Sequence, residues 1–443
     1  MTIEDISKNT DFIVPEPLNS NTNSIIKVVG VGGGGGNAVG YMYRLGVKDV
    51  KFVVCNTDKQ ALENSPVPDR VLLGHTGLGA GDKPEVALRD AQESIDAINA
   101  IFDDHTKMLF ITAGMGGGTG TGAAPVVAKA AKDRGVLTVG IVTIPFFFEG
   151  RKKIIKALQG AEEIRKHVDA LLLINNERLI EIYPDLDFDS AWDKADDTLA
   201  TAARSISDLI TCTDAKINID FNDVDTTLRN GGSAIISCGE AEGENRVQDA
   251  IDQALRSPLL NNTNIFSSKR LLFNLSYSRE STVPFRTGEM IAFTDFVNGI
   301  EDVEVIYGVS YDDTLGDKVK VTILASGFEA NNAVPELKGP RKPQQSPNPD
   351  KATRDEINII KEQYGANKAD DIRIAKARQR YVILTPDQLD DDNIIENLEK
   401  SATANRSKES KNSITQSAAP SAQRPATGTG TATPPDSSSV IEF

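Results

Sequence analysis

The sequence predicts an α/β fold in which a parallel sheet covered by helices is followed by a long central helix and a smaller α+β unit. Three observations support this: apolar strand-like runs alternate with helical stretches, a long helical pattern lies near 189–211, and the composition changes after Phe328. Continuous apolar strands alternating with helices are typical of a parallel sheet buried on both faces. The strand-like runs lie at 25–31, 50–55, 107–113, 136–143 and 170–175, and the helical stretches include 37–45 and 121–134.

Beyond the central helix the pattern predicts a second unit. Its strand candidates are 233–239, 270–277, 303–310 and 319–327, and its helical patterns are 246–255 and 287–297. After Phe328 the chain is rich in Pro, Asn, Gln, Ser and Thr, and it has too little apolar surface to offset the entropy of ordering. We therefore expect a mobile N-terminal extension (1–24), a first domain (25–188), the central helix (189–211), a second domain (212–328) and a disordered linker and tail (329–443).

The charge distribution limits the kinds of partner. The chain has 443 residues and a formal net charge of -16. Residues 330–443 hold 16 basic and 16 acidic side chains, so the excess of negative charge lies before them. Nonspecific nucleic-acid binding needs a basic surface that neutralises phosphates, and we therefore expect no direct nucleic-acid partner.

The chain has only three cysteines and three histidines, which argues against a disulfide-stabilised protein and against a zinc protein. Cys55, Cys212 and Cys238 are odd in number and far apart, so neither a disulfide framework nor a zinc cluster fits. No apolar run reaches the roughly 18 residues of a membrane span, and the N-terminus lacks the pattern of a signal peptide. We expect a cytoplasmic protein without a side-chain metal site, in which oxygen atoms hold any metal.

A first glycine-rich segment, GVGGGGGNAVG at 30–40, follows a strand and opens a helix. Glycines let backbone N–H groups close on an anion, and a helix N-terminus adds partial positive charge. Taken alone, the segment also fits a dinucleotide-binding fingerprint of Gly30, Gly32 and Gly35, with Asp58 in the place of a ribose-binding acid. An NAD-dependent oxidoreductase is therefore an alternative at this point.

A second glycine-rich segment, AGMGGGTGTGAAPV at 113–126, again follows a strand and opens a helix. Two such loops on adjacent strands do not suit a dinucleotide fold with one fingerprint. The chain contains no Gly-Lys dipeptide, so the Walker A lysine is missing and a P-loop NTPase is excluded. Backbone dipoles, hydroxyls, Mg²⁺ and a flanking Lys153 or Arg151 would have to meet the phosphate charge.

Several polar and aromatic residues are candidate nucleoside contacts. They are Asn37, Glu149 in PFFFEGRKK (145–153), Asn176 in INNERL (174–179), and Trp192 with Asp196 in AWDKADD (191–197). Guanine presents adjacent N–H donors, so a carboxylate such as Asp196 favours guanine, and Trp192 could stack on the base. The alternatives are a Trp in the core and Asn or Asp side chains that cap helices.

A third motif, NIDFNDV at 218–224, combines carboxylates and amides. Alternation directs Asn218, Asp220 and Asn222 to one side and Ile219 and Phe221 to the other, and Asp223 closes the motif. Carboxylates so placed could orient a water, or a Mg²⁺-bound water, for phosphoryl transfer. A capped, solvated turn is the alternative.

Together these motifs resemble the FtsZ family of tubulin-like cell-division GTPases, over about residues 25–328. GGGTGTG (116–122) is similar to the tubulin-superfamily signature, and GVGGGGGNAV, the PFxFEG pattern and the NxDFxDV pattern resemble the division proteins in particular. The resemblance implies a Rossmann-like GTPase domain, head-to-tail filaments at a mid-cell ring, and hydrolysis of GTP where the 218–224 loop reaches the next subunit's nucleotide.

The resemblance also implies roles for individual residues. Those near the phosphates and nucleoside are Gly33, Gly34, Gly35, Gly36, Asn37, Gly117, Gly118, Thr119, Gly120 and Lys153. Glu149 and Asn176 lie on the ribose side, and Trp192 and Asp196 lie at the base. Asp220, Asp223 and Asn218 would act in hydrolysis, and Mg²⁺ would bind mainly through phosphates and water.

Two departures from the family pattern concern contacts and partners. Lys153 stands where the family usually has Arg, and Arg151 could take over its contact. The end of the chain, PPDSSSVIEF (434–443), lacks the usual acidic peptide that docks other division proteins and membrane tethers. We still expect other division proteins to bind through the tail. We also expect the chain to reach the membrane only indirectly, through a tethering partner. A tubulin-like GTPase that regulates cell shape is a further alternative.

Overall fold

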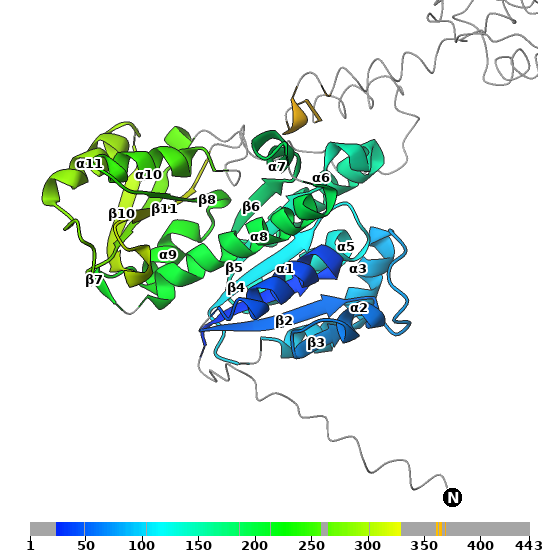
Figure 1. Ribbon diagram of the computed structural model, residues 1–443. Coiled ribbons are helices and arrows are strands. Elements are labelled where there is room, and N and C mark those ends of the chain that lie inside the picture. The colour runs from blue at the N-terminus through cyan, green and yellow to red at the C-terminus, as the bar shows by residue number, and fades with distance from the viewer. Residues whose placement is uncertain are drawn as a thin grey trace, which may run out of the picture. The chain divides into compact units, whose positions relative to one another are not determined.

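The computed structural model describes residues 24–328 apart from positions 48, 103, 186, 213, 258–264 and 301, and it also describes 360, 361, 363–365 and 368. The N-terminal extension expected at 1–24, apart from Ser24, lies outside the described residues. So does the tail expected at 329–443, apart from the few positions named above. The elements between 24 and 328 belong to one compact unit (Figure 1).

The first half of this unit alternates strands and helices, as predicted. Its elements are β1 (Ile26–Val31), α1 (Gly32–Arg44), β2 (Val50–Asn56), α2 (Lys59–Glu63), β3 (Asp69–Leu72), α3 (Pro84–Glu93), α4 (Ile95–Ala100), β4 (Met108–Gly114), α5 (Thr119–Lys132), β5 (Leu137–Ile144), α6 (Arg151–Arg165), β6 (Ala170–Asn175) and α7 (Glu177–Ile182). The strands form a parallel sheet in the order β3-β2-β1-β4-β5-β6. The pattern does not predict β3, because this four-residue strand is partly exposed and lacks an apolar run.

The second half has mixed strand directions, as an α+β unit should. Its elements are α8 (Phe188–Thr211), β7 (Ala215–Ile217), α9 (Phe221–Leu228), β8 (Gly232–Ala241), α10 (Arg246–Leu255), β9 (Arg270–Tyr277), α11 (Met290–Asn298), β10 (Glu304–Tyr311) and β11 (Val319–Ser326). Strand β11 pairs antiparallel with β8 and β9, whereas β9 and β10 are parallel. The predicted strand 270–277 and helix 246–255 match β9 and α10.

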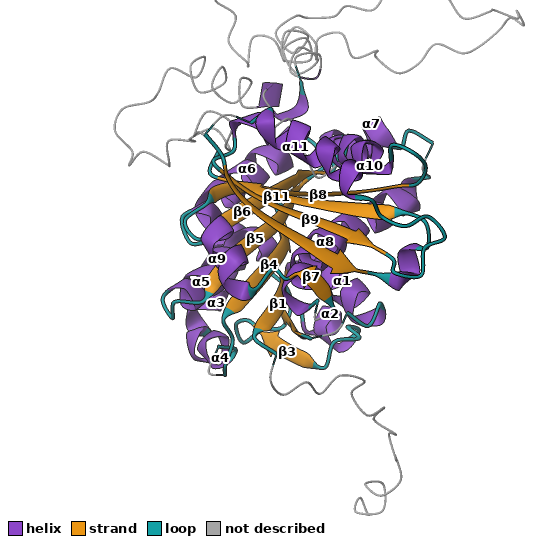
Figure 2. Cartoon of the chain, turned by 90° about the vertical axis from the view of Figure 1, so that its left-hand side faces the viewer, coloured by secondary structure: helices purple, strands orange, loops and turns teal. Residues whose placement is uncertain are grey.

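One sheet passes through both halves. Strand β6 pairs in parallel with β8 at Ala170↔Gly232 and Leu171↔Ser233. Within the described residues this short ladder joins eleven strands in the order β3-β2-β1-β4-β5-β6-β8-β11-β9-β10-β7. Figure 2 shows these strands as a twisted fan. The two halves are therefore connected by backbone pairing as well as by the central helix.

The central helix α8 contributes to the packing of both halves. It begins at Phe188 because the Asp187 carboxylate caps it, accepting from the backbone N–H of Ser190 at 2.9 Å. It contacts α1, β5 and β8 (Figure 1). Its buried apolar side chains join a cluster that extends from Ile26 in β1 to Leu324 in β11. The helix thus carries the residues near 192–197 to the carboxyl end of the first sheet half.

Candidate functional site

The first glycine segment forms the junction of β1 and α1. The helix predicted from position 37 begins at Gly32, because the glycines that follow fit closely against the sheet. An added Cβ on Gly35 would lie 2.2 Å from the carbonyl oxygen of Thr112 in β4. A Cβ on Gly33 or Gly36 would meet nothing within 4 Å. Gly35 therefore permits the packing of α1, whereas Gly33 and Gly36 face open space.

The second glycine segment turns the chain from β4 into α5. Gly116 has φ +103°, a conformation that favours glycine, and its N–H donates to the Thr121 hydroxyl at 2.9 Å. An added Cβ on Gly120 would lie 2.4 Å from the Gly114 carbonyl oxygen, while one on Gly117 would meet nothing within 4 Å. This segment, like the first, combines packing glycines with one that faces open space.

The two glycine segments lie next to each other. Strands β1 and β4 are parallel neighbours, so both segments leave the same edge of the sheet. An added Cβ on Gly32 would lie 2.8 Å from the Gly120 nitrogen, and one on Gly34 would lie 3.5 Å from the Gly114 Cα. The N-termini of two helices of 13 and 14 residues thus meet at one edge of the sheet. Their dipoles and free N–H groups favour an anion such as a phosphate chain.

A cavity of about 740 Å³ extends from the start of α1 to α8. Its size is within the range of small-molecule sites. The lining residues that come from the first glycine segment and from α8 are Gly32, Gly33, Gly36, Asn37, Gly40, Ser190, Asp193, Lys194, Asp196 and Asp197. The cavity therefore has glycine backbone at one end and carboxylates at the other.

Asp196 is the lining carboxylate with the most perturbed acidity. Burial raises its pKa to about 7, and the negative charge of Asp193 adds to the rise. Arg44 and a hydrogen bond with the Asn37 side chain oppose it. A carboxyl group in this state is ready to ionise when a ligand offers N–H donors. The fold thus brings Asn37 and Asp196 into direct contact.

The predicted ribose-side residues flank the sheet edge in two loops. Glu149 accepts from the Phe146 N–H at 2.8 Å and forms an ion pair with Lys153 one helical turn later. Lys153 is thus held by a carboxylate of its own chain. Asn176, which is 4% exposed, has a buried Oδ1 without a hydrogen-bond partner among the described residues. A buried amide oxygen of this kind needs a partner, and a bound ligand or water could supply it.

Trp192 belongs to an aromatic cluster at the start of α8. Its ring meets Phe146 edge-on with 5.0 Å between centroids, and it meets Phe148 and Phe188 at 6.4 Å each. The Trp192 side chain is half-buried, and Phe148 and Phe188 are exposed. The alternative of a core Trp is therefore wrong, and the ring lies one helical turn before Asp196.

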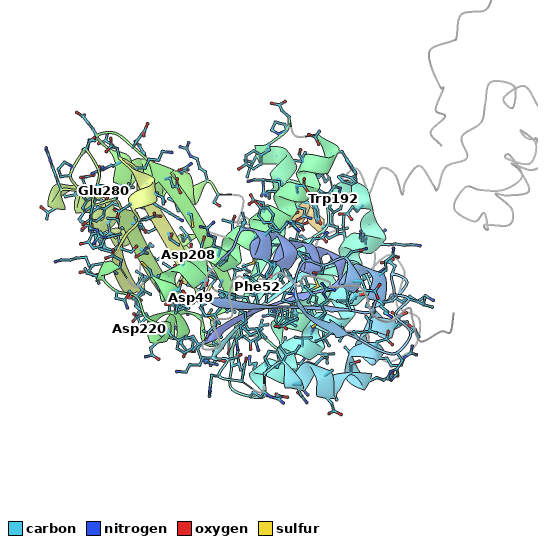
Figure 3. All side chains as sticks on the ribbon, turned by 60° about the horizontal axis from the view of Figure 1, so that its bottom comes forward. Asp49, Phe52, Trp192, Asp208, Asp220 and Glu280 are labelled. Carbon is cyan, nitrogen blue, oxygen red and sulfur yellow. The ribbon has the colours of Figure 1, made fainter. Side chains whose placement is uncertain are left out.

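The 218–224 motif lies apart from the cavity. Figure 3 shows Asp220 on the half of the molecule away from Trp192. The motif is not a strand, because β7 ends at Ile217 and α9 begins at Phe221. The predicted sides are nevertheless confirmed, since Ile219 and Phe221 pack on the core and Asn222 is exposed. Asn218 and Asp220 are exposed.

Two carboxylates of this motif form a reciprocal helix cap. Asp220 accepts from the N–H groups of Asn222 at 2.8 Å and Asp223 at 3.1 Å. Asp223 in turn accepts from the Asp220 N–H at 2.8 Å. This capping box orders both carboxylates at the surface of the subunit.

The residues that follow β2 also contribute to the site, and the sequence patterns did not predict this. Thr57 meets Thr119, the first residue of α5, with 2.7 Å between the hydroxyl oxygens. Asp58 caps α2 by accepting from the Ala61 N–H at 3.1 Å, so the alternative ribose-binding role is replaced by a structural one. Residues 57 and 58 contact a second segment, GHTGLGAGD (74–82), since the Gly79 N–H donates to the Thr57 carbonyl. The glycine spacing of that segment could have indicated it, because Gly74, Gly77, Gly79 and Gly81 have positive φ.

Two further features concern metals and membranes. Across the part of the chain that the structure describes, no group of three or more His, Cys, Asp or Glu side chains could hold a metal ion. No helix in the same part is both long and apolar enough to cross a membrane.

Comparisons with known proteins agree with this geometry. The model of the Tubulin/FtsZ family GTPase domain matches residues 25–184, and that of the FtsZ family C-terminal domain matches 232–329. The cell division protein FtsZ of Porphyromonas gingivalis is 48% identical over 394 residues, which cover 86% of this chain and 85% of the relative. That of Aquifex aeolicus is 41% identical, covering 68% of this chain and 83% of the relative.

Solved structures agree as well. An FtsZ dimer from M. jannaschii has a TM-score of 0.63 and 36% identity, and the match covers 70% of this chain and 89% of that one. CetZ2 from Haloferax volcanii, with a TM-score of 0.57 and 22% identity over 69% of this chain and 93% of that one, shares the fold. The predicted fold class and GTPase activity are confirmed, and an NAD-dependent oxidoreductase is excluded. The chain belongs to the FtsZ family of tubulin-like cell-division GTPases, and it is a GTP-dependent cytoskeletal protein.

Proposed function

We propose that this chain binds GTP in the 740 Å³ cavity and hydrolyses it only where two subunits meet head to tail in a filament. The observation that carries the proposal is the separation of two sets of residues. The cavity combines the first glycine segment with Asp196, and the second glycine segment lies directly beside the first. The ordered carboxylates Asp220 and Asp223 lie on another part of the subunit. One subunit thus supplies binding and its neighbour supplies the groups for hydrolysis.

The phosphates and the base occupy opposite ends of the cavity in this proposal. Backbone N–H groups of Gly33–Gly36 and Gly117–Gly120 hold the phosphates, helped by the Thr119 hydroxyl and Lys153. Asp196 in its ionised form accepts from the two adjacent N–H donors of guanine, and Asn37 orients its carboxylate. Adenine has no such pair of donors, which explains a preference for GTP.

The ribose and one face of the base lie between the remaining contacts. Glu149 and Asn176 flank the sugar, and the unpartnered Oδ1 of Asn176 accepts from one of its hydroxyls. The ring of Trp192, which is half-buried and one turn before Asp196, stacks on the base. These roles agree with the position of both loops at the carboxyl edge of the sheet.

Hydrolysis needs a positioned water and charge stabilisation. Asp220 and Asp223 of the incoming subunit orient the water, with Asn218 beside them, and the capping box keeps their geometry fixed before assembly. Mg²⁺ bound through phosphates and water would neutralise the charge that develops on the phosphates of the GDP leaving group. The side chains of Asp220, Asp223 and Asn218 supply the orientation of the water.

We place the filaments at the mid-cell division site, where they recruit other division proteins and reach the membrane only through a tethering partner. The family membership supports this localisation, and the FtsZ dimer from M. jannaschii supports self-association. The segment proposed for recruiting partners, 329–443, lies almost wholly outside the described residues.

The rate of hydrolysis per molecule tests the composite site. It should be near zero below a threshold protein concentration and rise above it, and light scattering should rise with GTP but not with GDP. Mixing wild type with Asp223→Ala should depress the rate more than dilution does, because each defective subunit spoils the site of its neighbour. A rate per molecule that stayed constant down to nanomolar protein, with GTP binding intact, would exclude a shared site.

A further inference from the structure

The second glycine segment is covered on one side by residues 79–83. An added Cβ on Gly118 would lie 2.8 Å from the Ala80 Cβ and 3.0 Å from the Lys83 nitrogen. The beginning of the covering segment is held by backbone contacts to the end of β2, since the Gly79 N–H donates to the Thr57 carbonyl at 3.0 Å. Its end runs directly into α3, which packs on α5: an added Cβ on Gly122 would lie 2.1 Å from the Pro84 carbonyl oxygen. Between these two ends, Asp82 is held by another element.

Helix α6 covers the other side of the same glycine segment. An added Cβ on Gly116 would lie 3.0 Å from the Cγ of Lys153. One turn further along α6, the Lys156 ammonium donates to both the carbonyl oxygen and the Oδ2 of Asp82, each at 2.8 Å. Helix α6, the glycine segment and residues 79–83 therefore form a closed ring, and the Lys156–Asp82 pair is the link that completes it.

The Lys156–Asp82 pair is not placed to stabilise the fold. The Asp82 side chain is 67% exposed and that of Lys156 is 25% exposed, and exposed ion pairs contribute little to stability. The double contact instead fixes a position, because it holds both the side chain and the backbone of one residue. Asp82 has φ +61°, a left-handed conformation that Asp tolerates better than most residues.

We propose that Lys156 is a positioning residue that holds residues 79–83 over the second glycine segment and thereby slows the release of bound nucleotide. The inference rests on the proposed function, because it assumes that this segment holds the phosphates. Without this link, residues 79–83 are held at their two ends, by the residues after β2 and by α3. The part next to Asp82 can then move away from the phosphate side of the site. The pair thus controls how long each subunit keeps its nucleotide between assembly events.

The release rate of a fluorescent guanine nucleotide, chased with excess unlabelled GTP, tests this role in the full-length chain. Lys156→Met should speed release by about three- to tenfold. Asp82→Asn should have a smaller effect, because the Asp82 carbonyl still accepts from Lys156 and Asn also tolerates positive φ. Lys156→Arg should restore slow release, and high salt should bring the wild type toward Lys156→Met because an exposed pair is screened.

Lys166→Met is the matched control. It removes a similar exposed pair from the end of α6, with Glu163 at 2.6 Å, and should leave the release rate unchanged. The melting temperature of each nucleotide-free variant should stay within about 1 °C of the wild type. If Lys156→Met released nucleotide at the wild-type rate, the inference would be wrong even with binding intact. If the wild type failed to bind guanine nucleotide at all, the proposed function itself would be wrong.

Discussion

The cavity between α1 and α8 and the Asp220–Asp223 cap are built in opposite ways. The cavity is made of backbone and of residues from elements far apart in the chain, and its wall depends on close packing, as at Gly32, where an added Cβ would lie 2.8 Å from the Gly120 nitrogen. The cap is made of neighbouring residues that satisfy each other at an exposed helix start. The cavity needs the whole fold of its own subunit, whereas the cap needs only a local turn.

This difference explains how one chain can separate binding from hydrolysis. In the proposed function, a single subunit can hold the nucleotide, because both glycine segments leave adjacent strands of one sheet. In the same proposal, the ordered carboxylates at the surface, Asp220 and Asp223, act on the nucleotide of a neighbouring subunit. Variants in the cavity and in the cap should therefore differ in kind: the former should change nucleotide binding, the latter hydrolysis.

The largest effect should come from Gly35→Ala. The new Cβ would meet the Thr112 carbonyl oxygen at 2.2 Å, and neither backbone can move without shifting α1 or β4. We expect a loss of about 3 kcal/mol or more in the free energy of unfolding, measured by urea titration. Gly36→Ala is the control: its Cβ would meet nothing within 4 Å, so the fold should persist while GTP binding weakens. Equal losses of stability in both variants would contradict the division between packing and ligand-facing glycines.

The next effect concerns turnover. Asp223→Ala should reduce hydrolysis by about 10²-fold at a protein concentration that supports assembly, because a water-orienting carboxylate is lost. GTP affinity, measured by calorimetry, should not change, since Asp223 lies outside the cavity. A matching loss of affinity would place Asp223 in the binding site of its own subunit and remove the contrast.

The pH dependence of GTP binding should show whether Asp196 in the cavity ionises when the nucleotide binds. Because the pKa of Asp196 is raised to about 7, the GTP dissociation constant should fall as pH rises to about 7 and then level. The slope should not exceed about tenfold per pH unit, and Asp196→Asn should remove it while weakening the preference for GTP over ATP. A wild-type affinity that stayed flat from pH 5.5 to 8 would show that this carboxyl does not ionise on binding.

The same carboxyl group has a consequence for stability. A pKa raised in the folded state means that its stabilising contribution is full below about pH 4 and is lost as pH rises toward 7. The nucleotide-free Asp196→Asn variant should therefore gain stability relative to the wild type between pH 5 and pH 8. Urea denaturation of both proteins at pH 5 and at pH 8 measures this change in the difference between their free energies of unfolding.

The smallest effect should come from the cap itself. Asp220→Ala removes the acceptor for the N–H groups of Asn222 and Asp223 and should cost about 1 kcal/mol of stability. Asp220→Ser keeps a capping oxygen and should recover most of that stability. Hydrolysis separates the two roles: if Asp220→Ser also recovered turnover, Asp220 would serve only as a cap.

Much of the fold was predictable because local patterns and global packing agree. Apolar runs placed β1, β2, β4, β5 and β6 to within about two residues, since strands buried on both faces carry an unbroken apolar signal. The start of α1 was predicted five residues late, because a run of glycines has low helix propensity and only the close contact of Gly35 with β4 makes a helix there favourable.

The residues of the candidate site are also recognisable in the sequence. Glycine segments, the 145–153 motif and the carboxylates near 196 are visible as residues, and their order in the chain resembles one family. The capping of Asp220 by Asp223 is also local, and the alternative of a capped turn was already open. The contact of Thr57 with Thr119 and the link between Lys156 and Asp82 were not predictable, because nothing in either segment points to its partner.

The sequence by itself determined the chemistry that this chain can offer: backbone N–H groups at two helix starts, carboxylates without histidine or cysteine clusters, and an acidic first part. Tertiary structure alone decided which of these groups meet. The parallel order of β1 and β4 brings two glycine segments to one edge, α8 carries Asp196 to Asn37, and the same helix leads to a cap that stays away from both. The physical reason is that a residue's type and local pattern act over a few positions, whereas burial, pKa and distance depend on strands and helices that pair across the whole chain.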